Sequence, residues 1–142
     1  MRSHRASWVR DDRATSAIEF ALLTPVFLLL LTGMLAYGIY FGAANSLQQL
    51  TADAARVAIA GLNEAERNRL VEAYLDNNAD QYLLLDSTHL TYTIRDDTSD
   101  PNQYLVTLRY DASELPIWNL YVPLPLPSSQ IAYSSTIRRG GI

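Results

Sequence analysis

A long run without any charged side chain, from Phe20 to Ala52, restricts most strongly what this chain can fold into. Its most apolar part, residues 21–44, is longer than the ~20 apolar residues that a helix needs to cross a hydrocarbon core of ~30 Å. A helix that is apolar on every side lies in a membrane or deep inside a large protein, and 142 residues leave too little chain to cover one. The sequence therefore predicts a transmembrane helix over residues 15–44.

Positive charge gathers before this run and predicts the orientation of the chain. Arg2, Arg5, Arg10 and Arg13 all precede it, and positively charged flanks tend to remain in the cytoplasm. We therefore expect residues 1–14 to be a basic cytoplasmic leader of a single-pass protein of the bacterial inner membrane. Residues 45–142 then form a periplasmic or extracellular domain.

The composition of that domain excludes several classes of function. The chain has no cysteine, so it can form neither a disulfide framework nor a thiolate metal site. Residues 45–142 carry seven arginines against twelve aspartates and glutamates, a balance of −5, which argues against a nucleic-acid-binding surface.

A basic stretch followed by an apolar run also outlines a secretory signal peptide, and this alternative stays open. The run is too long for a signal peptide, whose apolar region spans about 7–15 residues. Small residues at Gly42, Ala43 and Ala44 nevertheless offer a site for signal peptidase.

Helical periodicity continues past the membrane, so one helix is predicted from about Thr15 to Ala60, with Pro25 as a place for a kink and Gly61 as its stop. Asn63 is the predicted N-cap of a second helix. Its apolar stripe consists of Leu70, Val71, Tyr74 and Leu75, and Asn77-Asn78 ends it.

The last third of the chain alternates with period two and predicts strands over His89–Ile94, Tyr104–Tyr110 and Gln130–Ile137. Turn-forming residues between the first two strands predict an antiparallel hairpin. The proline-spaced stretch Pro116–Pro127 is expected to cross one end of the sheet as an extended connection. The predicted fold class is α+β, with a long N-terminal transmembrane helix, a short second helix and a small antiparallel sheet of three to four strands.

Residues suited to catalysis are sparse, and they have ordinary structural explanations. His89 alternates within a predicted strand, where a surface position is the simpler interpretation than a general base. Asp96, Asp97 and Asp100 precede Pro101 without the glycine-centred spacing of a calcium loop, so we interpret them as turn residues. We expect no enzyme activity, no metal and no cofactor.

Glu19 is the exception to the apolar pattern, because it stands at the start of the membrane run. A carboxylate at a bilayer centre costs about 2.5–3.5 kcal/mol on insertion scales, and less near an interface. Either Glu19 lies among the lipid headgroups and marks the boundary, or it pairs with a positive group of a neighbouring subunit.

The segment from Arg13 to Pro25, RATSAIEFALLTP, resembles the N-terminal signature of TadE-like pseudopilins of the tight-adherence (Flp-type) pilus. That signature has a basic leader, a small residue at the cleavage point, four further residues, a glutamate followed by an aromatic, an aliphatic run and an early proline. The amphipathic segment from Gln49 to Leu62 and the alternating C-terminus are also similar to the family. The family usually has Gly before the cut, where this chain has Ala14.

The resemblance implies that a prepilin peptidase cuts between Ala14 and Thr15, so that Glu19 becomes the fifth residue of the mature chain. Cleavage would create an α-ammonium group on Thr15, which the Glu19 carboxylate of a neighbouring subunit would neutralise. Thr15, Glu19 and Phe20 are therefore the implied assembly residues, and Gly38 and Gly42 have the GxxxG spacing of closely packed membrane helices.

The hypothesis is thus a minor pilin that takes part in pilus assembly. Its implied partners are other pilin-like subunits, the prepilin peptidase, the inner-membrane assembly platform and membrane lipid, with no nucleic acid. One alternative is an uncleaved single-pass protein with a periplasmic ligand- or partner-binding domain. The other is a secreted domain released near Ala44.

Overall fold

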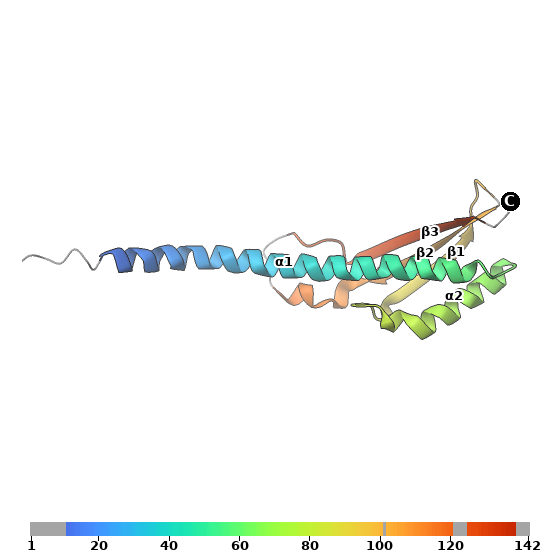
Figure 1. The fold of residues 1–142 in the computed structure, drawn as a ribbon, viewed down its shortest axis with the longest axis horizontal. Coiled ribbons are helices and arrows are strands. Elements are labelled where there is room, and N and C mark those ends of the chain that lie inside the picture. Colours follow the sequence, from blue (N-terminus) through green and yellow to red (C-terminus); the bar gives the residue numbers. More distant parts are fainter. Residues whose placement is uncertain (1–10, 101, 121–124, 139–142) are drawn as a thin grey trace, which may run out of the picture.

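The chain folds into one long helix that carries a small two-layer α+β domain on its C-terminal half (Figure 1). The computed structural model describes residues 11–100, 102–120 and 125–138. Helix α1, Asp11–Ala58, has 48 residues and is therefore about 72 Å long. Helix α1 covers strands β2 and β3, and helix α2 covers β1. The predicted fold class is confirmed, with a sheet of three strands.

The two halves of α1 have different surroundings. Most side chains between residues 15 and 32 are exposed. From Gly33 onward one face of the helix is buried against the domain. The residues on this face recur every three or four positions and are mostly small, which lets the sheet approach the helix closely: Ala36, Ala43, Leu47, Leu50, Ala54 and Ala58.

The ends of α1 differ slightly from the prediction. The helix begins at Asp11 rather than Thr15. It ends at Ala58 rather than Ala60, because the next three N–H groups bond carbonyl groups three residues earlier and tighten the last turn. The helix is continuous through Pro25.

Helix α2, Glu64–Asn78, begins as the sequence predicts. The Asn63 side chain accepts a hydrogen bond from the Glu66 N–H at 2.9 Å, and the Glu66 carboxylate accepts one from the Leu62 N–H at 2.9 Å. The first bond satisfies an N–H group that the first turn of a helix leaves without a partner, and the second ties the residue before the cap to that turn. The buried stripe of α2 includes Val71 and Leu75, as expected.

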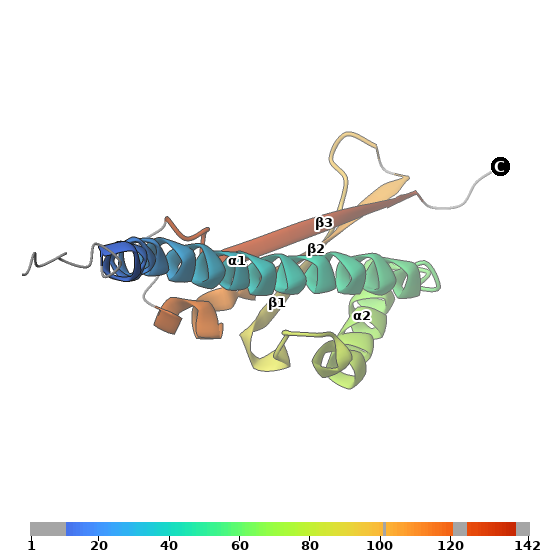
Figure 2. The ribbon, with the colours of Figure 1, turned by 60° about the vertical axis from the view of Figure 1, so that its left-hand side comes forward.

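The sheet has the order β1-β2-β3 and is antiparallel throughout (Figure 2). Its strands are β1, Leu90–Asp96, β2, Gln103–Asp111, and β3, Gln130–Arg138. The central strand alternates strictly, and one set of its side chains is buried against the helices: Tyr104, Val106, Leu108 and Tyr110. Among the residues that the structure describes, no helix covers the opposite face of the sheet.

The connection between β2 and β3 is partly helical, and the expectation of an extended segment over Pro116–Pro127 is wrong for its first part. Residues Pro116–Leu120 form the 3-10 helix η5, which packs against α1. Pro116 suits the first position of a helix, because its missing N–H would have no partner there. The Trp118 indole N–H donates to the Ala112 carbonyl at 2.6 Å and holds η5 in place. Residues 121–124 lie outside the described part of the chain.

A buried arginine joins α2 to the sheet, which the sequence pattern did not predict. The Arg67 side chain is 3% exposed, and its Nη2 lies 2.9 Å from Asp96 Oδ1. Its guanidinium carbon lies 4.9 Å from the centre of the Tyr104 ring, within the range of a cation–π contact. Because the ion pair needs both elements in place, it fixes the position of α2 relative to β1.

We predict that Gly61→Ala destabilises the domain. A β-carbon at Gly61 would lie 2.6 Å from Arg67 Cγ and 2.7 Å from the Arg67 backbone nitrogen, so α2 itself would have to shift. The expected loss in the free energy of unfolding is about 1–3 kcal/mol, measured by thermal unfolding of the full chain in detergent. Gly38→Ala is the matched control, since nothing lies within 4 Å of its added β-carbon. Equal melting temperatures for the two variants would contradict this account of Gly61.

Candidate functional site

The exposed N-terminal half of α1 is the most unusual surface of the molecule. Among the described residues, one helix is long and apolar enough to cross a membrane, with a mean hydropathy of 2.1 over its best 18 residues and 6% of that window buried. A core helix of a soluble domain would bury such residues. Here Phe20 is 73% exposed and Leu22 71%. Residues 15–32 span about 27 Å, close to the thickness of a hydrocarbon core.

Thr15, Glu19 and Phe20 lie at the start of this surface. Thr15 and Glu19 are four residues apart, so they share one face of the helix, with about 6 Å of rise between them. All three side chains are exposed. Among the side chains that the structure describes, no basic group lies within ion-pair distance of Glu19. A carboxylate in this position is therefore available to a partner.

The predicted cleavage point lies within helical backbone. Ala14 and Thr15 are consecutive residues of α1, three and four positions after its first residue, Asp11. Most of the predicted leader, residues 1–10, lies outside the described residues. The processing site and its assembly residues thus stay predictions at this stage.

The two glycines of the GxxxG spacing have different neighbours. Gly38 is exposed, and nothing lies within 4 Å of an added β-carbon, so a partner helix has room to approach it. An added β-carbon at Gly42 would lie 3.0 Å from Leu84 Cδ1 of the same chain. Leu84 itself has a positive φ of 64°, which is rare for a branched side chain. Gly42 therefore packs within the domain, whereas Gly38 faces outward.

The side chains of the domain that could serve in catalysis or metal binding instead take part in turns and helix caps. His89 Nδ1 lies 3.8 Å from Asp86 Oδ2. Asp97 and Asp100 accept hydrogen bonds from the N–H groups of Ser99 and Asn102 in the hairpin loop. Hydrogen bonds to this backbone N–H and to the Gln103 side chain lower the pKa of Asp100, so it stays ionised. The described residues contain no cluster of three side chains able to hold a metal ion.

A polar depression of about 610 Å³ lies where α1 meets α2 and the turn after it, and the sequence did not predict it. Asn45 and Gln49 of α1 face Tyr74 and Tyr82 there. The Tyr82 hydroxyl lies 2.9 Å from that of Tyr74 and donates to Asp53 at 2.8 Å. Burial, together with these two hydrogen bonds, raises the pKa of Tyr82 well above its usual value. The Tyr82 hydroxyl therefore stays protonated, and its hydrogen bonds link Tyr74 of α2 to Asp53 of α1.

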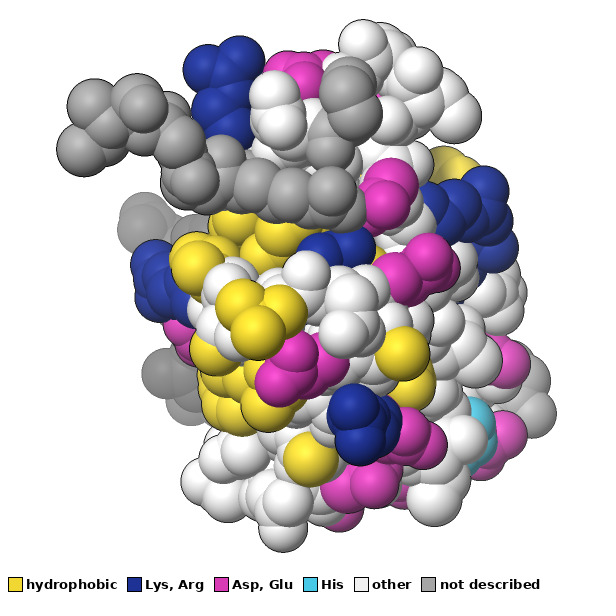
Figure 3. Space-filling view, turned by 90° about the vertical axis from the view of Figure 1, so that its right-hand side faces the viewer, with side chains coloured by type: hydrophobic (Ala, Val, Ile, Leu, Met, Phe, Trp, Pro, Cys, Tyr) yellow, Lys and Arg dark blue, Asp and Glu magenta, His cyan; other side chains and the backbone are white. Residues whose placement is uncertain are grey.

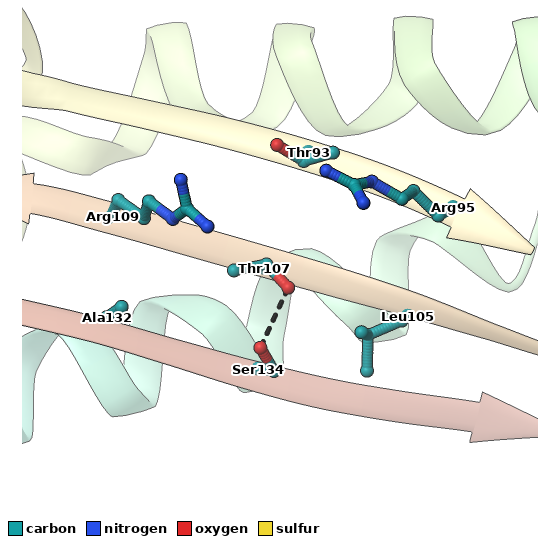
Figure 4. Close-up of a pocket in the computed structure, with 7 residues that line it drawn as sticks. All are labelled: Thr93, Arg95, Leu105, Thr107, Arg109, Ala132 and Ser134. Atoms are coloured by element: carbon teal, nitrogen blue, oxygen red, sulfur yellow. Dashed lines mark hydrogen bonds between the residues drawn. The ribbon is translucent and has the colours of Figure 1, made fainter. Parts of the chain in front are cut away.

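A second depression, of about 290 Å³, lies on the helix-free face of the sheet (Figure 4). Thr93, Thr107 and Ser134 from three adjacent strands form its centre, with Arg95 and Arg109 on either side. The period-two alternation of the strands shows in the sequence which residues share this face of the sheet. Which of these positions lie together depends on the register between strands, which the sequence alone did not provide.

The end of the domain that lies furthest from the N-terminus of α1 carries charges of both signs. Figure 3 shows acidic and basic side chains interspersed there among polar groups and a few hydrophobic ones. A nucleic-acid-binding surface would instead concentrate basic residues on one face. The mixed surface suits a domain that is exposed to water.

The geometry defines a chain with one exposed apolar helix, consistent with a membrane anchor, that continues without a break into a small α+β domain. Comparison with protein families identifies its N-terminal part: the model of the family TadE-like protein matches residues 14–56. The match begins at the residue before the predicted cut and extends through the buried part of α1. It confirms the resemblance noted in the sequence and indicates a protein associated with the Tad pilus. No curated protein and no solved structure matches the chain.

Proposed function

We propose that the chain is a minor pilin that takes part in assembly of a tight-adherence pilus. The observation that carries the proposal is the exposed apolar half of α1, with one carboxylate four residues after Thr15, inside the segment that matches the TadE-like family. The role is structural, as it is for that family. Lipid covers the apolar half first, and the helices of other pilin-like subunits cover it after assembly.

In this proposal, a prepilin peptidase removes residues 1–14 and creates a positive α-ammonium group on Thr15. The group lies about one helical turn from Glu19 in its own chain and meets the Glu19 carboxylate of the neighbouring subunit. Pairing removes two charges from an apolar environment, where each is costly alone. Because only one stagger of the helices brings the two groups together, the pair also sets the register between subunits.

The proposed orientation places the N-terminus in the cytoplasm, with residues 15–44 as the anchor and 45–142 as the outer domain. The packing of α1 shows which part of the anchor is in contact with the protein's own domain. Tyr37 donates a hydrogen bond to the Pro125 carbonyl, and Ala36 is fully buried. One face of residues 33–44 thus packs on its own domain, while Met34, Leu35 and Phe41 on the other face are exposed. Lipid or neighbouring subunits therefore need to cover residues 15–32 and the outer face of residues 33–44.

Release by signal peptidase near Ala44 fits the structure poorly. Ala43 is fully buried and Ala44 is 6% exposed, both in the middle of the continuous helix α1. A cut there would sever the helix inside the domain core. The uncleaved single-pass protein with a ligand- or partner-binding domain is the remaining alternative, and processing separates it from the pilin.

We predict that the full chain, produced in membranes with its prepilin peptidase and the inner-membrane assembly platform, begins at Thr15. Without the peptidase it should begin at Met1. The measurement is N-terminal sequencing together with intact mass of the extracted protein. Ala14→Gly, which restores the residue usual in the family, should be cut at least as completely. A chain that begins at Met1 under every condition would contradict the pilin proposal and favour the plain membrane anchor.

Loss of the Glu19 charge should impair pilus assembly without preventing processing. Glu19→Gln keeps the size of the side chain but cannot neutralise the Thr15 ammonium, so we expect about a tenfold or greater drop in the amount of protein recovered in pili, in line with the cost of one unpaired charge. Glu64→Gln, an exposed change at the start of α2, is the control and should leave recovery unchanged. Normal pilus recovery with Glu19→Gln would remove the charge-pairing mechanism.

A further inference from the structure

The helix-free face of the sheet carries two exposed arginines, Arg95 and Arg109. Neither has a carboxylate within ion-pair distance among the described side chains. They flank a row of hydroxyl groups in which Thr93 lies opposite Thr107, and the Thr107 hydroxyl lies 2.7 Å from that of Ser134. Figure 4 shows both arginine side chains extending toward the centre of this row from opposite ends.

The register of the strands explains why the two guanidinium groups face each other. Arg95 of β1 is opposite Leu105 of β2, and Arg109 lies four residues after Leu105 on β2. The Cα atoms of the two arginines are therefore about 14 Å apart. Each long side chain covers part of that distance. The result is a depression with a positive charge at each end and hydroxyl donors between them, which is the chemistry that binds carboxylate groups.

Acidic side chains gather on the opposite side of the molecule. Residues 70–94 contain no arginine or lysine. Glu72 and Asp76 are exposed, and they lie one turn apart on α2, beside its buried residues Val71 and Leu75. Burial, and then the negative charges of Glu72 and Asp76, raise the pKa of Tyr92. These carboxylates therefore form a negative patch on the helix layer of the domain.

One copy cannot bring its own two patches together, because the sheet layer and the helix layer face in opposite directions. A second copy in the same orientation can place its α2 carboxylates against the arginines of the first. We propose that the arginine and hydroxyl face of the sheet, formed by Arg95, Arg109, Thr93, Thr107 and Ser134, binds the Glu72 and Asp76 side chains of a second copy of this chain.

This contact is head-to-tail, since two different surfaces meet. Head-to-tail contacts that do not close into a ring extend into rows or helical filaments. The inference rests on the proposed function, because it supplies a domain-level contact for copies whose apolar helices already lie side by side. An extended polyanion fits the same face less well, since the surrounding domain carries an excess of negative charge that would repel it.

The absence of cysteine in the chain makes a direct test possible. Two differently tagged full-length copies, one with Ala132→Cys on the sheet face and one with Ala73→Cys on α2, would be produced together in membranes with the pilus machinery. Both positions are exposed. A short thiol cross-linker should join the two tags. Ala60→Cys, exposed in the turn just after α1, replaces Ala73→Cys as the control and should give little product.

Charge reversal then tests the chemistry of the contact. Arg95→Glu with Arg109→Glu in the first copy should lower cross-linking about tenfold. Glu72→Arg with Asp76→Arg in the second copy should lower cross-linking equally. The two sets combined should restore cross-linking, and this restoration also shows that each variant folds. No product between positions 132 and 73, or product only between two copies of position 132, would overturn the proposal.

The outcomes also separate this inference from the proposed function. Normal processing and normal pilus recovery without the 132–73 product would reject the contact and leave the pilin proposal standing. The 132–73 product from an unprocessed chain would reject the pilin proposal and support the contact. Binding of an acidic polysaccharide by the wild-type chain, lost in the Arg95→Glu, Arg109→Glu variant and without the 132–73 product, would assign the face to carbohydrate and overturn the inference.

Discussion

The packing of one face of α1 against the sheet is the interaction on which the rest of the structure depends. Leu47 and Leu50 are fully buried there, and burial of each such side chain contributes about 1.5–3 kcal/mol. Alanines on either side of them let the sheet lie close to the helix. Because α1 is one helix through the apolar half, with only the hydrogen bond of the missing Pro25 N–H absent, whatever holds residues 15–32 also fixes the orientation of the domain.

This continuity links the apolar surface to the proposed assembly. The described part of the chain does not cover the exposed half of α1, so this half needs lipid or other helices around it. A helix of this kind passes from one apolar environment to the other with little change in its own conformation. The specificity then has to come from the few polar groups near the N-terminus, which is why the single carboxylate at Glu19 has such weight in the proposed mechanism.

The sequence predicted the features that depend on local signals. The Asn63 cap, the turn residues between the first two strands and the period-two alternation of β2 each determine structure within a few residues, and each is confirmed. Features that depend on distant parts of the chain were missed. The burial of Arg67 requires Asp96 and Tyr104, and Gly42 packs on Leu84 rather than on a neighbouring helix.

The two surfaces of the candidate site differ in how far the sequence could predict them, because one is contiguous in the sequence and the other combines distant segments. The proposed processing motif is contiguous, so the residues from Ala14 to Phe20 could be proposed from their order alone. The arginine and hydroxyl face of the sheet combines three strands whose register is set by burial on the other side. The 3-10 helix at Pro116–Leu120 was also missed, because proline excludes a residue from a sheet centre without deciding between an extended and a helical connection.

The central claim is that residues 15–32 of α1 are covered by lipid or by other subunits, while the domain after residue 44 faces water. Single cysteines at Leu22, Val26 and Leu30, and at Ala65 and Ser128 in the domain, would be treated with a membrane-impermeant maleimide in spheroplasts, in which the outer face of the inner membrane is accessible. The account predicts that the three helix positions react only after detergent is added, whereas Ala65 and Ser128 react at once. Immediate reaction at Leu22, Val26 and Leu30 would contradict it.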